Sequence, residues 1–148
     1  MTNAPDGFTP LFRSSNFLDL IGPFYQRGMG RELVVGVRIA EKHVNARGFA
    51  HGGLLMTLCD IALGYAAATT HDPPLRAVTA SLTTDFAGSA QLGDWVEAHV
   101  DVHKIGSRLV FANAYLTVGA ERIVRASAVF ARTDGQRGGA APALRDER

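Results

Sequence analysis

Hydrophobic and polar residues alternate along several stretches of the chain, with the period of two that indicates β-strands with one buried face. One stretch lies in the first third of the chain, and the others follow one another in its second half. They predict strands at residues 32–40, 78–86, 96–102, 108–118 and 124–130. Short links at Gly93-Asp94, Gly106-Ser107 and Gly119-Ala120 favour antiparallel hairpins.

A different pattern covers residues 52–69, which are apolar on nearly every side of a helix. Such a helix is typical of a protein interior, because no face is left for water. Pro73 and Pro74 end it, since prolines cannot continue a helix. A shorter apolar patch at residues 17–21 predicts one or two helical turns. Residues 41–51 have no period and predict a loop.

The resulting order is a strand, a long buried helix and then four strands. One helix cannot cover both faces of a sheet, so we expect a sheet that curls around the helix, an α+β fold. Residues 1–132 then form a single domain, in which residues 1–13 are a loose N-terminal segment. Residues 133–148, rich in Gly and Ala, predict a disordered tail. An exposed strand at the sheet edge would favour dimerisation.

Length and charge restrict the class of protein. The 148 residues suffice for one domain with its own core, and the net charge of +1 argues against nucleic-acid binding. The single cysteine, Cys59, excludes an intrachain disulfide and a cysteine-cage metal site. Residues 1–8 lack the apolar run of a secretory signal, and Asp60 interrupts the longest apolar stretch. We therefore expect a cytoplasmic protein that does not span a membrane.

Asp60 is the only charged residue of the predicted long helix. A carboxylate among leucines is costly to bury without a partner, and an isolated one responds with a shifted pKa. Residues of this kind cluster at functional sites, so Asp60 is the first candidate for catalysis. The alternative is that Asp60 points to solvent or satisfies a backbone group.

Gly52 and Gly53 open the same helix. The first backbone N–H groups of a helix have no partner within it and lie at the positive end of its dipole. They can bind an anion or the oxyanion of an acyl transfer, although a tight loop entry explains the glycines equally well. Gly52 and Asp60 lie eight residues apart, or roughly 12 Å along the helix axis. If both act on one carbonyl, two subunits must share the site.

Residues 43–66, HVNARGFAHGGLLMTLCDIALGYA, combine an Asn, a Gly, a His-Gly-Gly run and an Asp at a specific spacing. In this they resemble the hotdog-fold thioesterases of the phenylacetate-degradation (PaaI-like) family. The resemblance extends over about residues 17–132, with residues 78–81 (VTAS), Phe86 and residues 92–94 (LGD) in register.

The resemblance implies a hotdog fold, in which a curved antiparallel sheet wraps around one long helix. It also implies edge-to-edge homodimers, often paired into homotetramers. The family hydrolyses acyl-CoA thioesters, so coenzyme A would be part of the substrate and no separate cofactor is expected.

The family's site residues correspond to four positions of this chain. Gly52 corresponds to the oxyanion-hole amide, and Asn45 to the residue that orients substrate or water. Asp60 corresponds to the carboxylate and Thr79 to a supporting hydroxyl, and in the family these two come from the neighbouring subunit. Asp60 would act as a general base toward water or attack directly as a nucleophile.

Contacts with coenzyme A are less defined by the sequence. Residues 87–89 (AGS) replace the Arg-Pro or similar pair that the family often has, near where coenzyme A tends to bind. Gly53 and His51 adjoin the helix start, and His51 would either transfer protons or hold the loop. Lys104 and Arg108 flank a glycine turn and could meet CoA phosphates, although ordinary surface charges explain them equally well.

Other side chains have simpler interpretations. His99 and His103 have a spacing that suits a metal ion on a helix, but they lie in a predicted strand and indicate its solvated face, so no metal site is expected. Cys59 has nothing marked beside it to activate a thiol and is expected in the core. The side chains that suit an apolar or aryl acyl pocket are Phe17, Leu20, Met56 and Tyr65.

The sequence thus predicts a thioesterase for an aryl- or medium-chain acyl-CoA. The alternative is a hotdog module that binds acyl-CoA without hydrolysing it, but such a module has no need to bury a carboxylate. A dehydratase or hydratase of this fold would need a paired Asp and His at its own spacing, which the sequence lacks.

Overall fold

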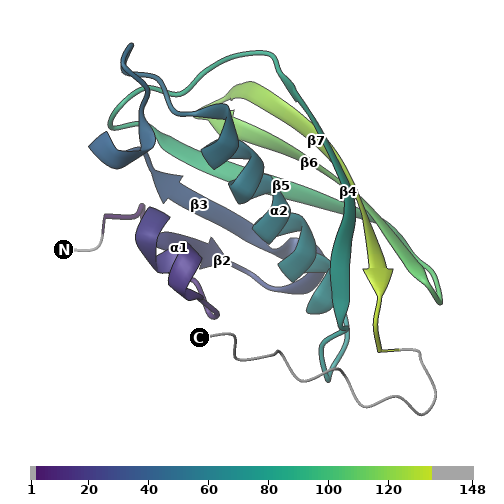
Figure 1. The fold of residues 1–148 in the computed structure, drawn as a ribbon. Helices are drawn as coiled ribbons and strands as arrows, with labels where there is room; N and C mark the ends of the chain where they lie inside the picture. The colour runs from purple at the N-terminus through teal and green to yellow at the C-terminus, as the bar shows by residue number, and fades with distance from the viewer. Residues whose placement is uncertain (1–2, 135–148) are drawn as a thin grey trace, which may run out of the picture.

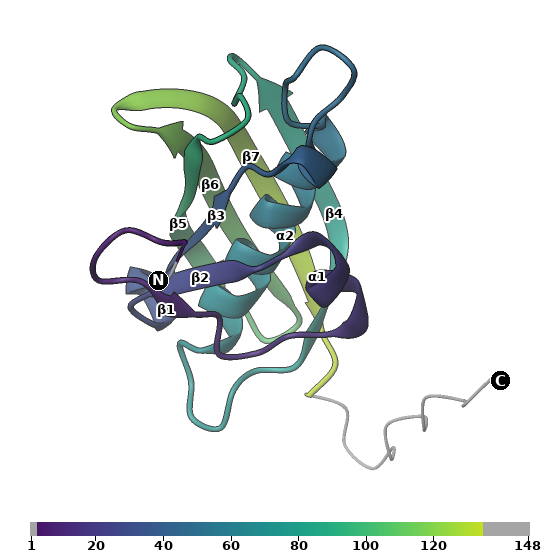
Figure 2. The same cartoon turned by 90° about the vertical axis from the view of Figure 1, so that its left-hand side faces the viewer.

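One antiparallel sheet curls around one long helix in the computed structural model, which describes residues 3–134 (Figures 1 and 2). The strands are β1 (Thr9–Pro10), β2 (Phe24–Arg27), β3 (Val34–Arg38), β4 (Ala77–Phe86), β5 (Trp95–Ile105), β6 (Leu109–Val118) and β7 (Glu121–Arg132). The helices are α1 (Asn16–Ile21) and α2 (Gly52–Ala68), with 3₁₀ turns η1 (Gly30–Glu32) and η2 (Glu41–His43). This arrangement confirms the predicted α+β class.

The core lies between α2 and the concave face of the sheet. Alternate residues of the strands point inward, as a period of two requires, and meet the buried side chains of α2. Leu58, Ala62 and Leu63 of α2 are fully buried there, as are Val96 and Leu116 of the sheet. The apolar pattern therefore positions α2 across the sheet.

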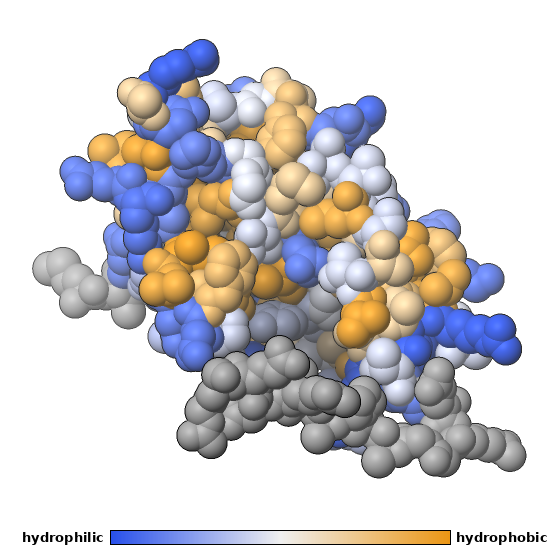
Figure 3. Space-filling view, in the orientation of Figure 1, coloured by the Kyte–Doolittle hydropathy of each residue, from blue (hydrophilic) through white to orange (hydrophobic). Residues whose placement is uncertain are grey.

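One face of α2 is not covered, which corrects the expectation of a helix buried on every side. Met56, Thr57, Asp60 and Gly64 are partly exposed in the single chain, and Gly53 is exposed. They follow one another at helical spacing and form a stripe along the helix. Figure 3 shows apolar surface interspersed with polar residues on this side of the molecule.

The strand order is β1-β2-β3-β5-β6-β7-β4, so β4 is not next to β5. The predicted hairpin at Gly93-Asp94 is therefore wrong, whereas the turns at Gly106-Ser107 and Gly119-Ala120 do connect paired strands. β4 instead crosses to the far side of the sheet and pairs with β7. This leaves β4 as a ten-residue edge strand, whereas the opposite edge, β1, has two residues.

Both ends of the described chain are more ordered than the sequence predicted. Phe8 is buried against the Trp95 ring at 5.1 Å, and Thr9–Pro10 pairs with β2. The expectation of a loose segment up to residue 13 is thus wrong for this part. At the other end, Thr133 donates its backbone N–H to Arg76, while residues 135–148 of the predicted tail lie outside the described residues.

Within residues 3–134, none of the helices is long and apolar enough to cross a membrane. The chain forms a single sheet-and-helix unit over this range.

Candidate active site

Asp60 and Thr79 meet between α2 and β4. The Thr79 hydroxyl donates a hydrogen bond of 2.7 Å to Asp60 Oδ1. Asp60 lies on the uncovered stripe of α2, and Thr79 lies on the edge strand beside a bulge between Thr79 and Ser81. The contact leaves the second carboxylate oxygen available to a water or a substrate, because no other hydrogen bond to Asp60 occurs within residues 3–134.

The surroundings of Asp60 differ from the sequence expectation. The carboxylate is partly exposed rather than enclosed by leucines, because it lies on the uncovered stripe of α2 beside the edge strand β4. Its neighbour Cys59 is fully buried, and burial, followed by the nearby charge of Asp60, raises the pKa of the thiol to about 12. The prediction that Cys59 belongs to the core is confirmed, and its thiol is not a nucleophile at neutral pH.

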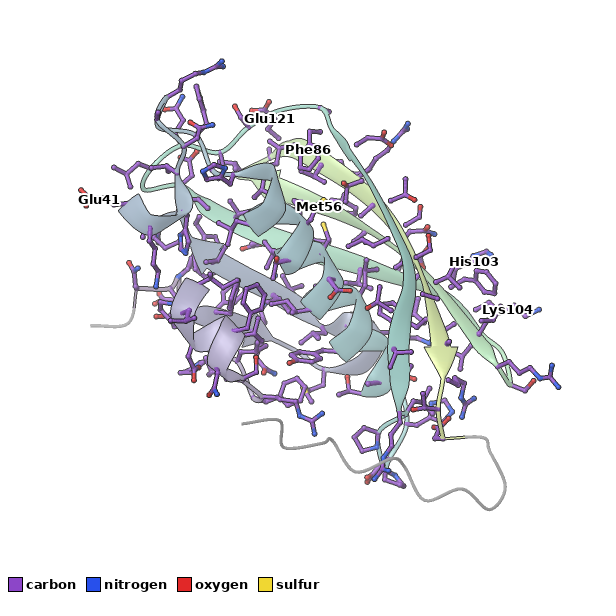
Figure 4. All side chains as sticks on the ribbon, in the orientation of Figure 1. Glu41, Met56, Phe86, His103, Lys104 and Glu121 are labelled. Carbon is purple, nitrogen blue, oxygen red and sulfur yellow. The ribbon has the colours of Figure 1, made fainter. Side chains whose placement is uncertain are left out.

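The N-terminus of α2 presents free backbone donors. The N–H groups of Gly52 and Gly53 have no acceptor within residues 3–134, and the preceding His51 caps the helix without a side-chain hydrogen bond. A Cβ added to Gly52 would lie 3.3 Å from Cζ of Phe86, whereas one added to Gly53 would meet nothing within 4 Å. Phe86, labelled in Figure 4 at the end of β4, therefore lies over Gly52.

Asn45 organises the loop that precedes α2. Its side-chain oxygen accepts hydrogen bonds from the backbone N–H groups of Arg47 (2.9 Å) and Phe49 (3.2 Å). The amide NH₂ group of Asn45 has no acceptor in the described part of the chain and remains able to donate to a ligand. Gly48, with φ +82°, permits the tight turn that brings these groups together.

The histidine that holds this loop is His43, not His51. The buried His43 ring accepts a hydrogen bond from the N–H of Ala40 and donates one to the carbonyl of Ile21. Its carbonyl accepts from the N–H of His51 at 2.9 Å. The His51 ring is exposed and makes no hydrogen bond within residues 3–134, so the loop-holding role expected of it is wrong.

The two candidate halves of the site lie apart in one chain. Gly52 lies against Phe86, at one end of β4, and Asp60 lies against Thr79, near the other end. Their separation of eight residues on one helix agrees with the roughly 12 Å expected from the sequence.

A pocket of about 460 Å³ opens beside Asp60. It lies between α1, the C-terminal half of α2 and the start of β4, and it contains Thr79. Of the four side chains that the sequence suggested for an acyl pocket, Phe17 and Tyr65 line it, whereas Leu20 and Met56 do not. Arg13 and Arg76 also line this pocket, and sequence patterns did not single them out because both are exposed charges outside any periodic element.

The remaining candidates lie away from this pocket. Lys104 and Arg108 flank the turn between β5 and β6, and neither is among the residues that line the Asp60 pocket. Figure 4 shows Lys104 and His103 pointing away from α2. His99 stacks on Tyr115 and hydrogen-bonds Glu97 at 3.0 Å. No group of three or more potential metal ligands occurs in the described range.

The sheet curls around one helix, which carries a carboxylate and begins with free backbone amides. Comparison with known families assigns this arrangement to a class of protein. A family model for the thioesterase superfamily matches residues 47–123, which include Gly52, Asp60 and Thr79. This chain belongs to the thioesterase superfamily, and the resemblance read from the sequence is confirmed.

Individual relatives agree with this assignment. The chain is 53% identical over 131 residues to a Pseudomonas aeruginosa protein named "Putative esterase PA0474", a match that covers 88% of this chain and 98% of that protein. Its fold resembles smu.793 of Streptococcus mutans bound to acetyl CoA (TM-score 0.73, 23% identity, 83% and 95% of the two chains). It also resembles a mutant of the phenylacetic acid degradation protein PaaI of Thermus thermophilus (TM-score 0.72, 23% identity, 80% and 99%).

Proposed function

We propose that this protein is a thioesterase that hydrolyses an aryl- or medium-chain acyl-CoA, with Asp60 as its reactive carboxylate. The observation that carries the proposal is the Asp60–Thr79 hydrogen bond on the wall of a mainly apolar pocket. The Thr79 hydroxyl holds the Asp60 carboxylate through Oδ1 and leaves Oδ2 free to face a bound thioester. Coenzyme A enters only as part of the substrate.

The site is shared between two subunits in this proposal. β4 is an open edge that can pair with β4 of a second copy, and such an isologous pair is antiparallel. Pairing about Leu82 or Thr83 sets residue 86 of one strand opposite residue 78 or 80 of the other, on either side of Thr79. Since Gly52 lies against Phe86, this pairing brings the free amide of Gly52 of the partner subunit toward Asp60.

Hydrolysis then follows from these groups. The partner's Gly52 N–H donates to the thioester carbonyl oxygen and stabilises the oxyanion that forms there. Asp60 takes a proton from a water molecule while the water oxygen bonds to the carbonyl carbon, and the C–S bond breaks to release coenzyme A and the free acid. Alternatively, Asp60 bonds to the carbonyl carbon itself and the C–S bond breaks to release coenzyme A. Water then hydrolyses the resulting anhydride to the free acid and the Asp60 carboxylate. Asn45 of the partner subunit donates its amide N–H to the substrate or to this water.

The experiment is thiol release from a panel of acyl-CoAs, measured for the wild type and Asp60→Asn. The amide is nearly isosteric, so the fold should remain, while kcat should fall by about 10²–10⁴ through loss of the general base. Asp101→Asn is the matched control, because Asp101 is exposed on β5 and lies outside both the pocket and the proposed β4 pairing. Near wild-type turnover by Asp60→Asn would refute the role of Asp60. Tight acyl-CoA binding without turnover by the wild type would instead favour a binding module.

A further inference from the structure

The pocket beside Asp60 carries two arginines that the proposed reaction does not use. Arg13 precedes α1, and Arg76 immediately precedes β4. Together with Asp60 they are the only charged residues that line the pocket within the described chain. The acyl pocket therefore has one carboxylate where the chemistry would occur and two positive charges elsewhere.

Both guanidinium groups lack a partner. Neither Arg13 nor Arg76 makes a side-chain hydrogen bond or an ion pair within residues 3–134. By contrast, Arg125 pairs with Asp85, and Arg132 pairs with Asp134. A guanidinium binds carboxylates and phosphates through charge-assisted hydrogen bonds, so two free ones on a pocket wall suit an anionic group of the ligand.

The position of Arg76 in the chain limits how far it lies from Asp60. Arg76 is three residues from Thr79, which limits its backbone to about 10 Å from the Asp60–Thr79 contact. Tyr65 lies within reach of both charges: burial raises the pKa of its hydroxyl, Arg13 lowers it and Asp60 raises it. A medium-length acyl chain spans this interval.

The pocket that carries these charges is lined largely by apolar residues. Ile61, Ala68 and Leu75 are among them, and such side chains favour methylene groups over the polar pantetheine arm of coenzyme A. An anion held by the arginines thus belongs to the acyl group rather than to the coenzyme.

We propose that the preferred substrate is an acyl-CoA whose acyl group ends in a carboxylate, which Arg13 and Arg76 bind. This inference rests on the proposed thioesterase function and names the substrate class of the same site. Hydrolysis of such a substrate releases a dicarboxylic acid and coenzyme A.

The test compares adipoyl-CoA with its terminal methyl ester, which has nearly the same shape without the charge. The wild type should show a kcat/KM at least about tenfold higher for adipoyl-CoA. In the double variant Arg13→Gln/Arg76→Gln, kcat/KM for adipoyl-CoA should fall by about 10- to 100-fold, while the value for the methyl ester stays the same. Retained turnover of the ester shows that the variant is folded.

Arg125→Gln is the control, since it removes a surface arginine outside the pocket and should change neither value. Equal losses for both substrates in the double variant, or a wild-type preference for the ester, would overturn the inference. The phosphates of coenzyme A are the other negative groups that the arginines could bind. Inhibition by free coenzyme A tests this, and its inhibition constant should be the same for the double variant as for the wild type. Weakened inhibition would assign the arginines to CoA phosphates and overturn the inference. Failure to hydrolyse any acyl-CoA would overturn the proposed function itself.

Discussion

Two adjacent glycines at the start of α2 differ in the space around them. A methyl group at Gly52 would lie 3.3 Å from the Phe86 ring and would push that ring by a few tenths of an ångström, whereas one at Gly53 would meet no atom within 4 Å. The proposed oxyanion binds at Gly52. A single methyl group therefore distinguishes the two positions.

We expect Gly52→Ala to lower kcat by up to about 100-fold, the cost of an impaired oxyanion-hole donor. Gly53→Ala should instead raise the free energy of unfolding by about 0.5 kcal/mol, because alanine restricts the unfolded chain without a clash. Steady-state kinetics and denaturant unfolding of both variants measure these effects. Unchanged kcat and KM in Gly52→Ala would remove Gly52 from the proposed mechanism.

Cys59 connects burial with a pH dependence of stability. The pKa of its thiol is about 12 in the folded chain against an ordinary value of 9.0, mainly because of burial. A raised folded pKa stabilises the protein fully below pH 9, and this contribution is lost as the pH rises toward 12. The wild type should thus lose stability above pH 9 by a steeper slope than Cys59→Ala, as measured by denaturant unfolding at several pH values. Parallel slopes would mean that the thiol ionises as readily in the folded state.

At the scale of elements, the exposed strand β4 is the edge through which we propose that a second copy binds. Thr83 is exposed and lies at or next to the centre of the proposed pairing, where it would face residue 83 or 81 of the second copy. Thr83→Glu would place two like charges opposite or diagonal to each other, which destabilises strand pairing.

We expect Thr83→Glu to convert the dimer to a monomer of unchanged circular dichroism and to abolish thiol release. Sedimentation velocity measures the assembly. Ser127→Glu is the matched control, since Ser127 pairs with Thr83 from the interior strand β7 and adds the same charge one strand inward. A monomeric Thr83→Glu protein with full turnover would show that one chain contains the whole site.

The strands that the sequence predicted are those with a clear period. β3 to β7 alternate between apolar and polar residues, whereas α2 was predicted from its long, nearly continuous apolar run. β1 is too short to show a period, and β2 buries three successive residues, so its pattern does not alternate. The partner of β4 could not be predicted either. Hairpin rules favour the next strand, whereas β4 pairs with β7, whose partner residues lie about 40 to 55 positions further along the chain.

Some residues of the candidate site could be predicted from the sequence, and others could not. Asp60 stood out as a charge in an apolar helix, and Thr79 came from the resemblance alone. Arg13 and Arg76 were not predicted, because only the folded chain brings the segment before α1 and the residue before β4 to one pocket. Long-range contacts of this kind leave no local pattern in the sequence.

At the scale of the whole molecule, a shared site predicts complementation between defective chains. Asn45→Ala and Asp60→Asn should each be nearly inactive, because every site of either homodimer lacks one group. In a mixed dimer, one of the two sites combines the intact Asn45 of the Asp60→Asn chain with the intact Asp60 of the Asn45→Ala chain. Refolding equal amounts together should therefore restore about a quarter of wild-type activity, since half of the dimers are mixed and half of their sites are intact. Mixed dimers seen by native mass spectrometry without recovered activity would place the site within one chain.

The unequal edges of the sheet have a consequence for growth into fibres. A strand edge that is long and open can template one chain after another, which is how soluble sheets become fibrils. Here one edge has ten residues and the other only two. Two copies joined through β4 consume both long edges and expose only the two-residue β1 at either end, so the sheet has no template for a third chain. The same pairing that we propose to complete the site therefore also ends the edge-to-edge growth of the sheet.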